Sequence, residues 1–216
     1  MKRLLTLLIL VLSSVIAKAS EEDSIRTFLF PQFETGIVVL KSNGARLSAQ
    51  FNYDMVDERM LYIEADSTIN ELDARAVISV TIGEHTFIPS KNKAFYEIIK
   101  TDDKEYYVSH KSKVLSQGKS AGYGSYSQTA SISGFIITNS AGNIYLLGSG
   151  EKFKGVDETA IFIKNGKKYE KITSLKTLVK HFKSHQAHIE SYAKDNKINF
   201  SKVENVTSIV EYALSL

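Results

Sequence analysis

The stretch Arg46-Leu-Ser-Ala-Gln-Phe-Asn-Tyr53 alternates polar and apolar side chains at every position. Successive side chains of a β-strand point to opposite faces, so this pattern predicts a strand with one buried and one solvated face. Just before it, the apolar run Gly36-Ile-Val-Val-Leu40 leads into Asn43-Gly44, a pair that suits the positive φ angles of a two-residue hairpin turn. The sequence therefore predicts an antiparallel hairpin over residues 36–53.

Further short apolar or alternating segments follow this hairpin, separated by turn residues such as Gly83-Glu84 and Asn165-Gly166. No helical pattern lies between them, and parallel strands would need long crossover connections. We therefore expect antiparallel meanders, arranged as a sandwich, an open barrel or a coiled sheet. The predicted strands cover residues 59–64, 77–82, 85–89, 95–100, 105–115, 135–139, 144–147, 160–164 and 168–172.

From Ser174 onward the apolar residues recur at helical rather than strand spacing. Three apolar stripes predict three helices, with a break near Ser184 between the first two. A capping box, Ser201-x-x-Glu204, is expected at the start of the third helix. The predicted fold class is α+β: a predominantly antiparallel β portion followed by about three C-terminal α-helices. The stripes are Leu175, Leu178, Val179 and Phe182; Ile189, Tyr192 and Ala193; and Val206, Ile209, Val210 and Ala213.

The chain begins with the features of a cleavable secretory signal peptide. A positive start, Met1-Lys2-Arg3, precedes an apolar run over 4–16 and the small-x-small motif Ala17-Lys18-Ala19. The apolar run is shorter than the roughly 20 residues that cross a bilayer, so no transmembrane segment is expected after cleavage. We predict an exported protein, placed in the periplasm, with the cell surface or the medium as alternatives.

The predicted organisation is a signal peptide over 1–19, an antiparallel β domain over 20–172 and a helical segment over 173–216 packed on it. The chain has no cysteine. Disulfides, thiolate metal sites and a cysteine nucleophile are therefore excluded.

Removal of residues 1–19 leaves 24 basic and 24 acidic residues. This balance gives no support to nucleic-acid binding. The charge is unevenly placed, because residues 20–163 carry 14 basic and 19 acidic groups whereas 164–216 carry 10 and 5. The basic tail is suited to peripheral contact with an anionic surface, or it is simply a solvated basic face.

Residues 116–131 form a Gly-, Tyr- and Ser-rich loop that differs in composition from the rest of the chain. Glycines give backbone freedom and tyrosines give a large contact area at low entropic cost, a mixture that binding loops use. We predict ligand or partner binding through Gly122, Tyr123, Gly124 and Tyr126. The alternative is a loop that binds nothing.

His181, His185 and His188 follow one another at i, i+4 and i+7, a spacing that places three imidazoles on one face of a helix. Such a face can bind zinc or copper. The predicted break near Ser184 and the neighbouring lysines favour a solvated face instead. No cofactor is predicted.

The acidic residues Asp54, Asp57 and Glu58 come directly after the alternating strand. Their oxygens are of the type that binds calcium, but the spacing is not that of a helix-flanked calcium loop. A solvated acidic turn is the favoured interpretation.

Motifs of hydrolytic catalysis are not found. Neither Ser133-Gly134 nor Gly148-Ser149-Gly150 forms the nucleophile elbow GxSxG. His85 and His110 occur in predicted strands, and nothing in the sequence links them. The sequence leans against an enzyme without excluding one.

Several short motifs resemble a group of uncharacterised secreted proteins of Bacteroidetes type, over most of the chain after residue 30. The resemblance implies export but no activity, cofactor or catalytic residue. The second tail helix of that group is rich in lysine, whereas this chain has His185 and His188 there, a difference that favours a solvated face. The motifs are Pro31-x-Phe33-x-x-Gly36-x-Val38-x-Leu40, Asn52-Tyr53-Asp54, Met60, Val80-x-Ile82-Gly83, Phe87-Ile88, Tyr96-Glu97, the Gly-Tyr-Gly loop and Val210-Glu211-Tyr212.

Together these patterns predict an exported envelope protein that binds an unidentified ligand or envelope protein without catalysis. A hydrolase acting on envelope or extracellular material and a metal-binding protein using the tail histidines are the two alternatives.

Overall fold

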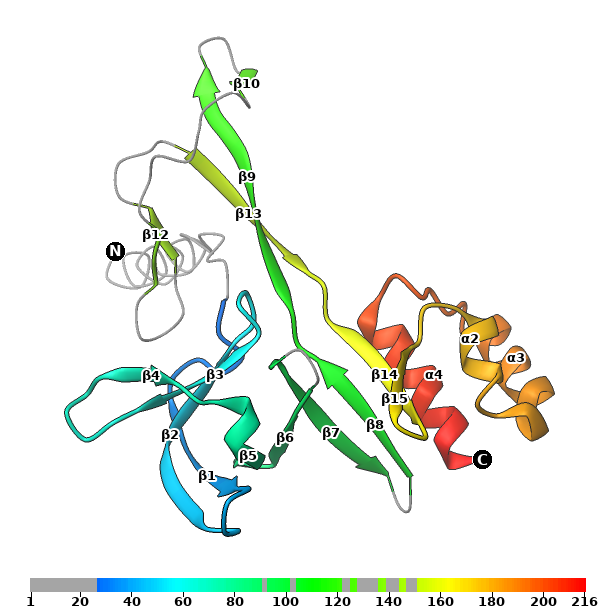
Figure 1. The fold of residues 1–216 in the computed structure, drawn as a ribbon. Coiled ribbons are helices and arrows are strands. Elements are labelled where there is room, and N and C mark those ends of the chain that lie inside the picture. The colour runs from blue at the N-terminus through cyan, green and yellow to red at the C-terminus, as the bar shows by residue number, and fades with distance from the viewer. Residues whose placement is uncertain are drawn as a thin grey trace, which may run out of the picture.

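The computed structural model describes residues 27–90, 93–101, 104–121, 125–127, 136–138, 144–146 and 151–216. The predicted signal peptide lies outside these residues. Their main feature is a ten-stranded antiparallel sheet in the order β15-β14-β8-β7-β6-β5-β1-β2-β3-β4 (Figure 1). The strands of this sheet are β1 Glu34–Leu40, β2 Arg46–Asp54, β3 Arg59–Ile63, β4 Ile69–Glu71, β5 Val77–Ile82, β6 His85–Pro89, β7 Phe95–Thr101, β8 Lys104–Ser109, β14 Ala160–Asn165 and β15 Lys168–Lys171.

The predicted α+β class is confirmed, with helices α2 Leu175–Val179, α3 Gln186–Asp195 and α4 Val203–Ser215 after the strands. The sheet coils, so that the turn after β2 reaches the chain between β8 and β9 Ser112–Ala121. There the amide of Ser112 donates to the carbonyl of Met55 over 2.9 Å, and Lys111 pairs with Glu58. Of the three predicted arrangements, the coiled sheet describes the structure.

The coiled half of the sheet encloses an aromatic core. The side chains of Tyr53 and Phe87 are buried and stack with their ring centroids 6.0 Å apart. Gly36 is placed where β1 passes close to both of its neighbours. A Cβ at this position would lie 2.6 Å from the carbonyl oxygen of Thr81 and 2.9 Å from a ring carbon of Phe51. Glycine is therefore required by space rather than by backbone angle.

Asn52 fixes the chain that enters this core. Its buried side chain accepts hydrogen bonds from the amides of Phe30 and Tyr53 and donates to the carbonyls of Phe30 and Gln32. The buried Phe30 is thereby held against Phe87, with ring centroids 6.2 Å apart. A polar residue of the alternating strand thus organises an aromatic segment from outside the sheet.

A second core lies between the sheet and the helices. The α4 side chains of Ile209 and Val210 and the α2 side chain of Leu178 have no exposed surface, and they pack with residues of β8 and β14. The apolar stripes predicted for the three helices all contribute to this layer. The predicted capping box is wrong, because α4 begins at Val203 after an N-cap residue, Lys202, whose side chain makes no capping hydrogen bond.

Beyond the sheet, β9 pairs with β13 Glu151–Asp157 to form a two-stranded arm (Figure 1). The arm continues the pair formed by β8 and β14, and β10 Ser125–Ser127 pairs with its outer part. A separate two-stranded sheet joins β11 Ile136–Thr138 and β12 Ile144–Leu146. The sequence predicts one strand over 105–115, whereas the structure divides it at His110 and Lys111.

The first hairpin turn also differs from its prediction. Leu40 and Ala45 are joined by a backbone hydrogen bond, so the loop holds four residues rather than two, and only Gly44 has a positive φ, of 69°. Asn43 instead accepts a hydrogen bond from the amide of Ala45. A two-residue loop does occur at Gly166 and Lys167, where Asn165 pairs with Lys168.

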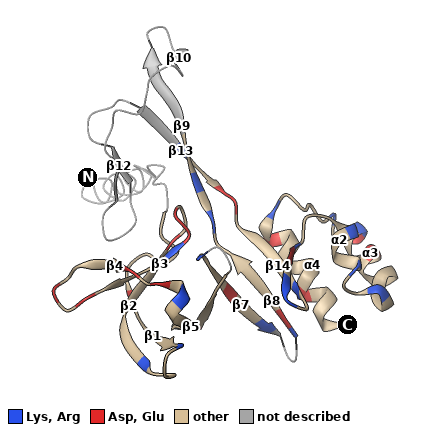
Figure 2. Cartoon of the chain, viewed as in Figure 1, with Lys and Arg blue, Asp and Glu red and all other residues tan. Residues whose placement is uncertain are grey.

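Acidic side chains lie on the loop between β3 and β4, and lysines lie on β15 and on the helical end (Figure 2). The uneven charge of the sequence is therefore also uneven in space. Within the described part of the chain, none of the helices combines the length and the apolar character needed to cross a membrane.

Candidate functional site

A buried carboxylate joins two histidines on the inner face of the sheet. Oε1 of Glu97 lies 2.6 Å from Nδ1 of His85, and Oε2 lies 2.5 Å from Nε2 of His110. Each imidazole donates through the named nitrogen when that nitrogen carries a proton. Only 6% of the Glu97 side chain is exposed, compared with 48% for His85 and 18% for His110.

The strand register explains how residues so far apart in sequence meet. Glu97 pairs with Phe87 of β6 on one side and with Val108 of β8 on the other. His85 and His110 lie two positions from those partners, so all three side chains share one face of the sheet.

The electrostatics of the cluster favour an ionised Glu97. Burial by itself would raise the pKa of this carboxyl, but the hydrogen bonds from His110 and His85 outweigh it and lower the pKa. The cluster therefore holds a buried negative charge beside two imidazole rings.

The rings of both histidines pack against aromatic side chains of the core. The ring of His85 stacks on Phe87 at 6.4 Å and meets the edge of Phe30 at 5.3 Å, and the ring of His110 lies 6.5 Å from Phe87. This packing restrains the ring of His110, which is 18% exposed, more than the ring of His85, which is 48% exposed. Chemically, the arrangement can accept, hold and release protons at a fixed place in the sheet.

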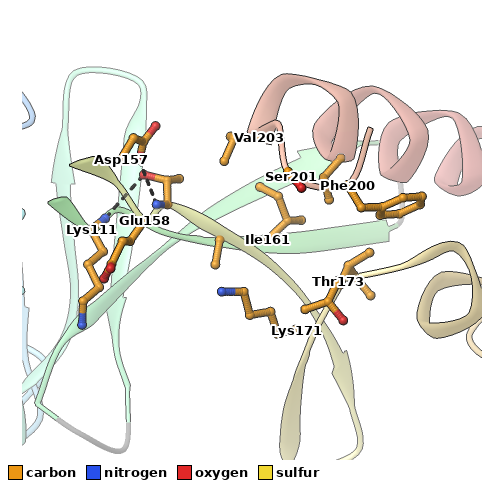
Figure 3. Close-up of a pocket in the computed structure, with 13 residues that line it drawn as sticks. Lys111, Asp157, Glu158, Ile161, Lys171, Thr173, Phe200, Ser201 and Val203 are labelled. Carbon is orange, nitrogen blue, oxygen red and sulfur yellow. Dashed lines mark hydrogen bonds between the residues drawn. The ribbon is translucent and has the colours of Figure 1, made fainter. Parts of the chain in front are cut away.

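A groove of about 610 Å³ lies nearby, where the arm joins the sheet. Its lining comes from the start of β14, the end of β15 and the chain leading into α4 (Figure 3). The buried side chains of Ile161, Ile172 and Val206 form an apolar floor, and Phe200 and Ser201 lie at the helical side.

Three of the polar side chains that line the groove, those of Lys111, Asp157 and Thr159, already form hydrogen bonds. Nζ of Lys111 lies 2.5 Å from a carboxylate oxygen of Glu58, and Asp157 accepts a hydrogen bond from the amide of Thr159. Within the described residues, no hydrogen bond or ion pair engages the ammonium group of Lys171. Figure 3 shows this side chain extending beneath Ile161 and away from the helical side.

The Gly/Tyr/Ser segment 116–131 is described in part, since residues 116–121 belong to β9 and residues 125–127 form β10. Gly122, Tyr123 and Gly124 are not among them, and Tyr126 is placed only through the backbone of β10. The structure locates β10 at the outer part of the arm, away from both cores (Figure 1). Binding through this loop stays a prediction.

The tail histidines are not brought together on one helix. His181 follows α2 and lies 3.1 Å from a carboxylate oxygen of Glu170, in an alignment unsuited to a hydrogen bond, so the contact is electrostatic when the ring is protonated. His185 precedes α3, and His188 is exposed on it. In the described part of the chain, no group of three histidine or acidic side chains is arranged to hold a metal ion.

The acidic turn after β2 is closed by the protein itself. Asp54 accepts hydrogen bonds from the amides of Val56 and Asp57 and from the guanidinium of Arg59. Glu58 points instead toward Lys111. The favoured interpretation of a solvated acidic turn therefore holds for Asp57, whose side chain is exposed, but is wrong for Asp54, which is buried by these contacts.

Sequence reasoning noted His85 and His110 but missed their connection through Glu97. The signal is the pairing register: two successive hairpins with known turns would place the three residues on adjacent strands. The groove carries no such signal, because its walls meet only through packing of α4 on the sheet.

Comparison of the chain with protein-family models, curated proteins and solved structures finds no match to any of them.

Proposed function

We propose that this protein is an exported, non-catalytic binding protein of the cell envelope, and that its ligand occupies the groove at the base of the arm. Export rests on the signal-peptide pattern of residues 1–19. The observation that carries the binding proposal is the exposed ammonium group of Lys171, which lines the groove beside Ile161 and has no partner among the described residues.

The size and lining of the groove support a small ligand. Sites for small molecules usually have volumes of roughly 300–1,000 Å³, with apolar walls and a few polar groups that fix orientation. The groove has a volume of about 610 Å³ and an apolar floor of Ile161, Ile172 and Val206. The ligand class that fits is a small, largely polar molecule with an anionic group facing Lys171 and a limited apolar part in contact with Ile161, Ile172 and Val206.

Binding is favoured over catalysis because the lining lacks a catalytic arrangement. Among the described residues, no histidine lines the groove, and both Lys111 and Asp157 already have partners. Glu158, Lys171, Thr173 and Ser201 remain as polar groups, and the described residues include no nucleophile hydrogen-bonded to a base among them, which suits recognition rather than proton transfer.

Site-specific photocrosslinking in native envelopes tests this proposal. A photoreactive amino acid at Thr173, which lines the groove, is expected to capture a small molecule that increases the protein mass. The same group at the exposed Glu84, in the turn between β5 and β6, serves as the matched control. Equal capture from both positions, or none from Thr173, would contradict the proposal.

A charge reversal measures the contribution of Lys171. Hydrogen bonds to charged groups contribute about 1.5–3 kcal/mol, so Lys171→Glu should reduce capture at Thr173 at least tenfold. The exposed Lys164→Glu on β14 is the control substitution, and it should leave capture unchanged.

A hydrolase is the second candidate function, supported by the half-exposed His85 ring held by Glu97. A histidine oriented by a carboxylate can serve as a general base. Chromogenic carboxylic and phosphate esters test this: turnover by the wild type that His85→Gln removes would favour the enzyme, and equal rates for both proteins would exclude His85 from any turnover.

A further inference from the structure

The arm joins the sheet through two short crossing points. One is His110-Lys111, between β8 and β9, and the other is Glu158-Thr159, between β13 and β14. They are tied to each other, because the amide of Glu158 donates to the carbonyl of Lys111 over 2.8 Å. The position of the arm therefore depends on how the first crossing is fixed to the sheet.

Side chains that carry charge make most of that attachment. His110 is held by Glu97, and Lys111 is held by Glu58. One backbone contact adds to them, from the amide of Ser112 to the carbonyl of Met55. A crossing held in this way responds to the charge state of its partners.

We propose that the base of the arm is a proton-responsive joint, in which protonation of the cluster of His85, Glu97 and His110 fixes the crossing more firmly to the sheet. Two groups contact Glu97 directly: His85 from β6 and His110, which follows β8. A third, Tyr106 of β8, is close enough for the charge of Glu97 to help raise its pKa. Histidine is the side chain that ordinarily changes charge between pH 5 and 8, so the two imidazoles are the groups that act.

The charge states give the direction of the effect. With both rings neutral, the cluster contains an uncompensated buried carboxylate, which is costly in a low-dielectric interior. The first proton makes the cluster neutral and turns a hydrogen bond from a neutral ring to the Glu97 carboxylate into a hydrogen-bonded ion pair. His110 is the less exposed ring and has the shorter contact, so its attachment gains most.

A second proton is accommodated by His85. This ring is nearly half exposed and can turn toward solvent, leaving the pair of Glu97 and His110 intact. The pair of Lys111 and Glu58 holds the same crossing from the other side, and Glu58 raises the pKa of Lys111, so this lysine stays charged throughout.

The joint also borders the groove, since Lys111 and Glu158 line it. A pH-dependent change at the crossing is therefore expected to make the affinity of the groove for its ligand depend on pH. Only this expected link to ligand binding rests on the proposed function. The joint itself needs no ligand and is tested without one.

Hydrogen exchange measured by mass spectrometry at pH 8 and pH 6 tests the joint on the whole exported chain. Rates are divided by the intrinsic exchange rate at each pH. Protection of the segment 109–112 is expected to rise about fivefold at pH 6, the upper end of the change produced when a partly exposed ion pair forms. The segment 59–71 contains no histidine and is the internal reference, with no change expected.

Two substitutions decide whether the cluster causes the change. His110→Gln keeps an N–H donor near Glu97 but cannot be protonated, so the rise in protection should vanish. His85→Gln replaces only the more exposed ring, so it should disturb folding less, and it should retain at least part of the rise in protection of 109–112 at pH 6. A rise that persists in His110→Gln, or one that is equal in 59–71, would overturn the proposal.

Discussion

Substitution of Asn52 by alanine should be among the most destabilising single changes in the coiled half of the sheet. The buried side chain makes four hydrogen bonds, two to Phe30 and one each to Gln32 and Tyr53. A typical intramolecular hydrogen bond contributes about 1 kcal/mol net, and each buried partner left unsatisfied costs about 1–3 kcal/mol. Water will bind some of the backbone groups that lose their partner in the variant, so we expect the free energy of unfolding to fall by about 3–4 kcal/mol.

Urea unfolding followed by far-ultraviolet circular dichroism measures this loss, since the chain has no tryptophan for fluorescence. Asn43→Ala is the matched control, because Asn43 makes its hydrogen bonds on the exposed turn between β1 and β2. It should cost no more than about 0.5 kcal/mol. A loss below about 1 kcal/mol for Asn52→Ala, or equal losses for both variants, would refute the role given to Asn52.

Three further changes probe the cluster, the sheet and the helical layer. The lowered pKa of Glu97 means that its charge stabilises the fold above its ordinary pKa of 4.5 and that this stability is lost as pH falls below that value. The stability difference between wild type and Glu97→Gln should therefore shrink from pH 6 to pH 3 in urea titrations, and a difference that grows would contradict the assignment. Gly36→Ala should lower the free energy of unfolding by about 1–3 kcal/mol, because the new Cβ would lie 2.6 Å from the carbonyl oxygen of Thr81. Thermal unfolding measures this loss, and an unchanged melting temperature would show that the two strands can move apart at little cost. Ile209→Ala, in the core beneath α4, should cost about 2–5 kcal/mol in one cooperative transition, and a separate early transition would mean that the helices unfold independently of the sheet.

The strands that the sequence predicts best are those with local signals. Residues 77–82 and 85–89 match β5 and β6, because alternation flanks a Gly83-Glu84 turn that the structure retains with a positive φ at Gly83. The three-residue β4 and the Lys-rich β13 have too little alternation to be found. Local pattern is strong only where a strand is long and one face is buried.

The break at His110 and Lys111 shows what local reasoning misses. The segment 109–113, Ser-His-Lys-Ser-Lys, is entirely polar, but it contains no glycine or proline to mark a stop, so the sequence predicts one strand over 105–115. The interruption comes from contacts with Glu97 and Glu58, which lie 13 and 53 positions away along the chain. Such a break is a property of the tertiary structure and follows from no local propensity.

The candidate sites also differ in whether a local sequence signal or a tertiary contact reveals them. Composition predicts a binding loop, which stays a prediction, and spacing singles out three tail histidines, whereas the cluster around Glu97 required knowledge of two strand registers. The groove required in addition the packing of α4 on the sheet. The cluster therefore depends on how the strands pair, and the groove depends on how the helix packs against them.

Native mass spectrometry of the protein purified from its own envelope tests the central claim most directly. Binding in the groove predicts a population heavier than the signal-free chain by one small ligand, and the loss of that population in Lys171→Glu. The ligand-free mass alone in both proteins, or a ligand retained equally by Lys171→Glu, would contradict the claim.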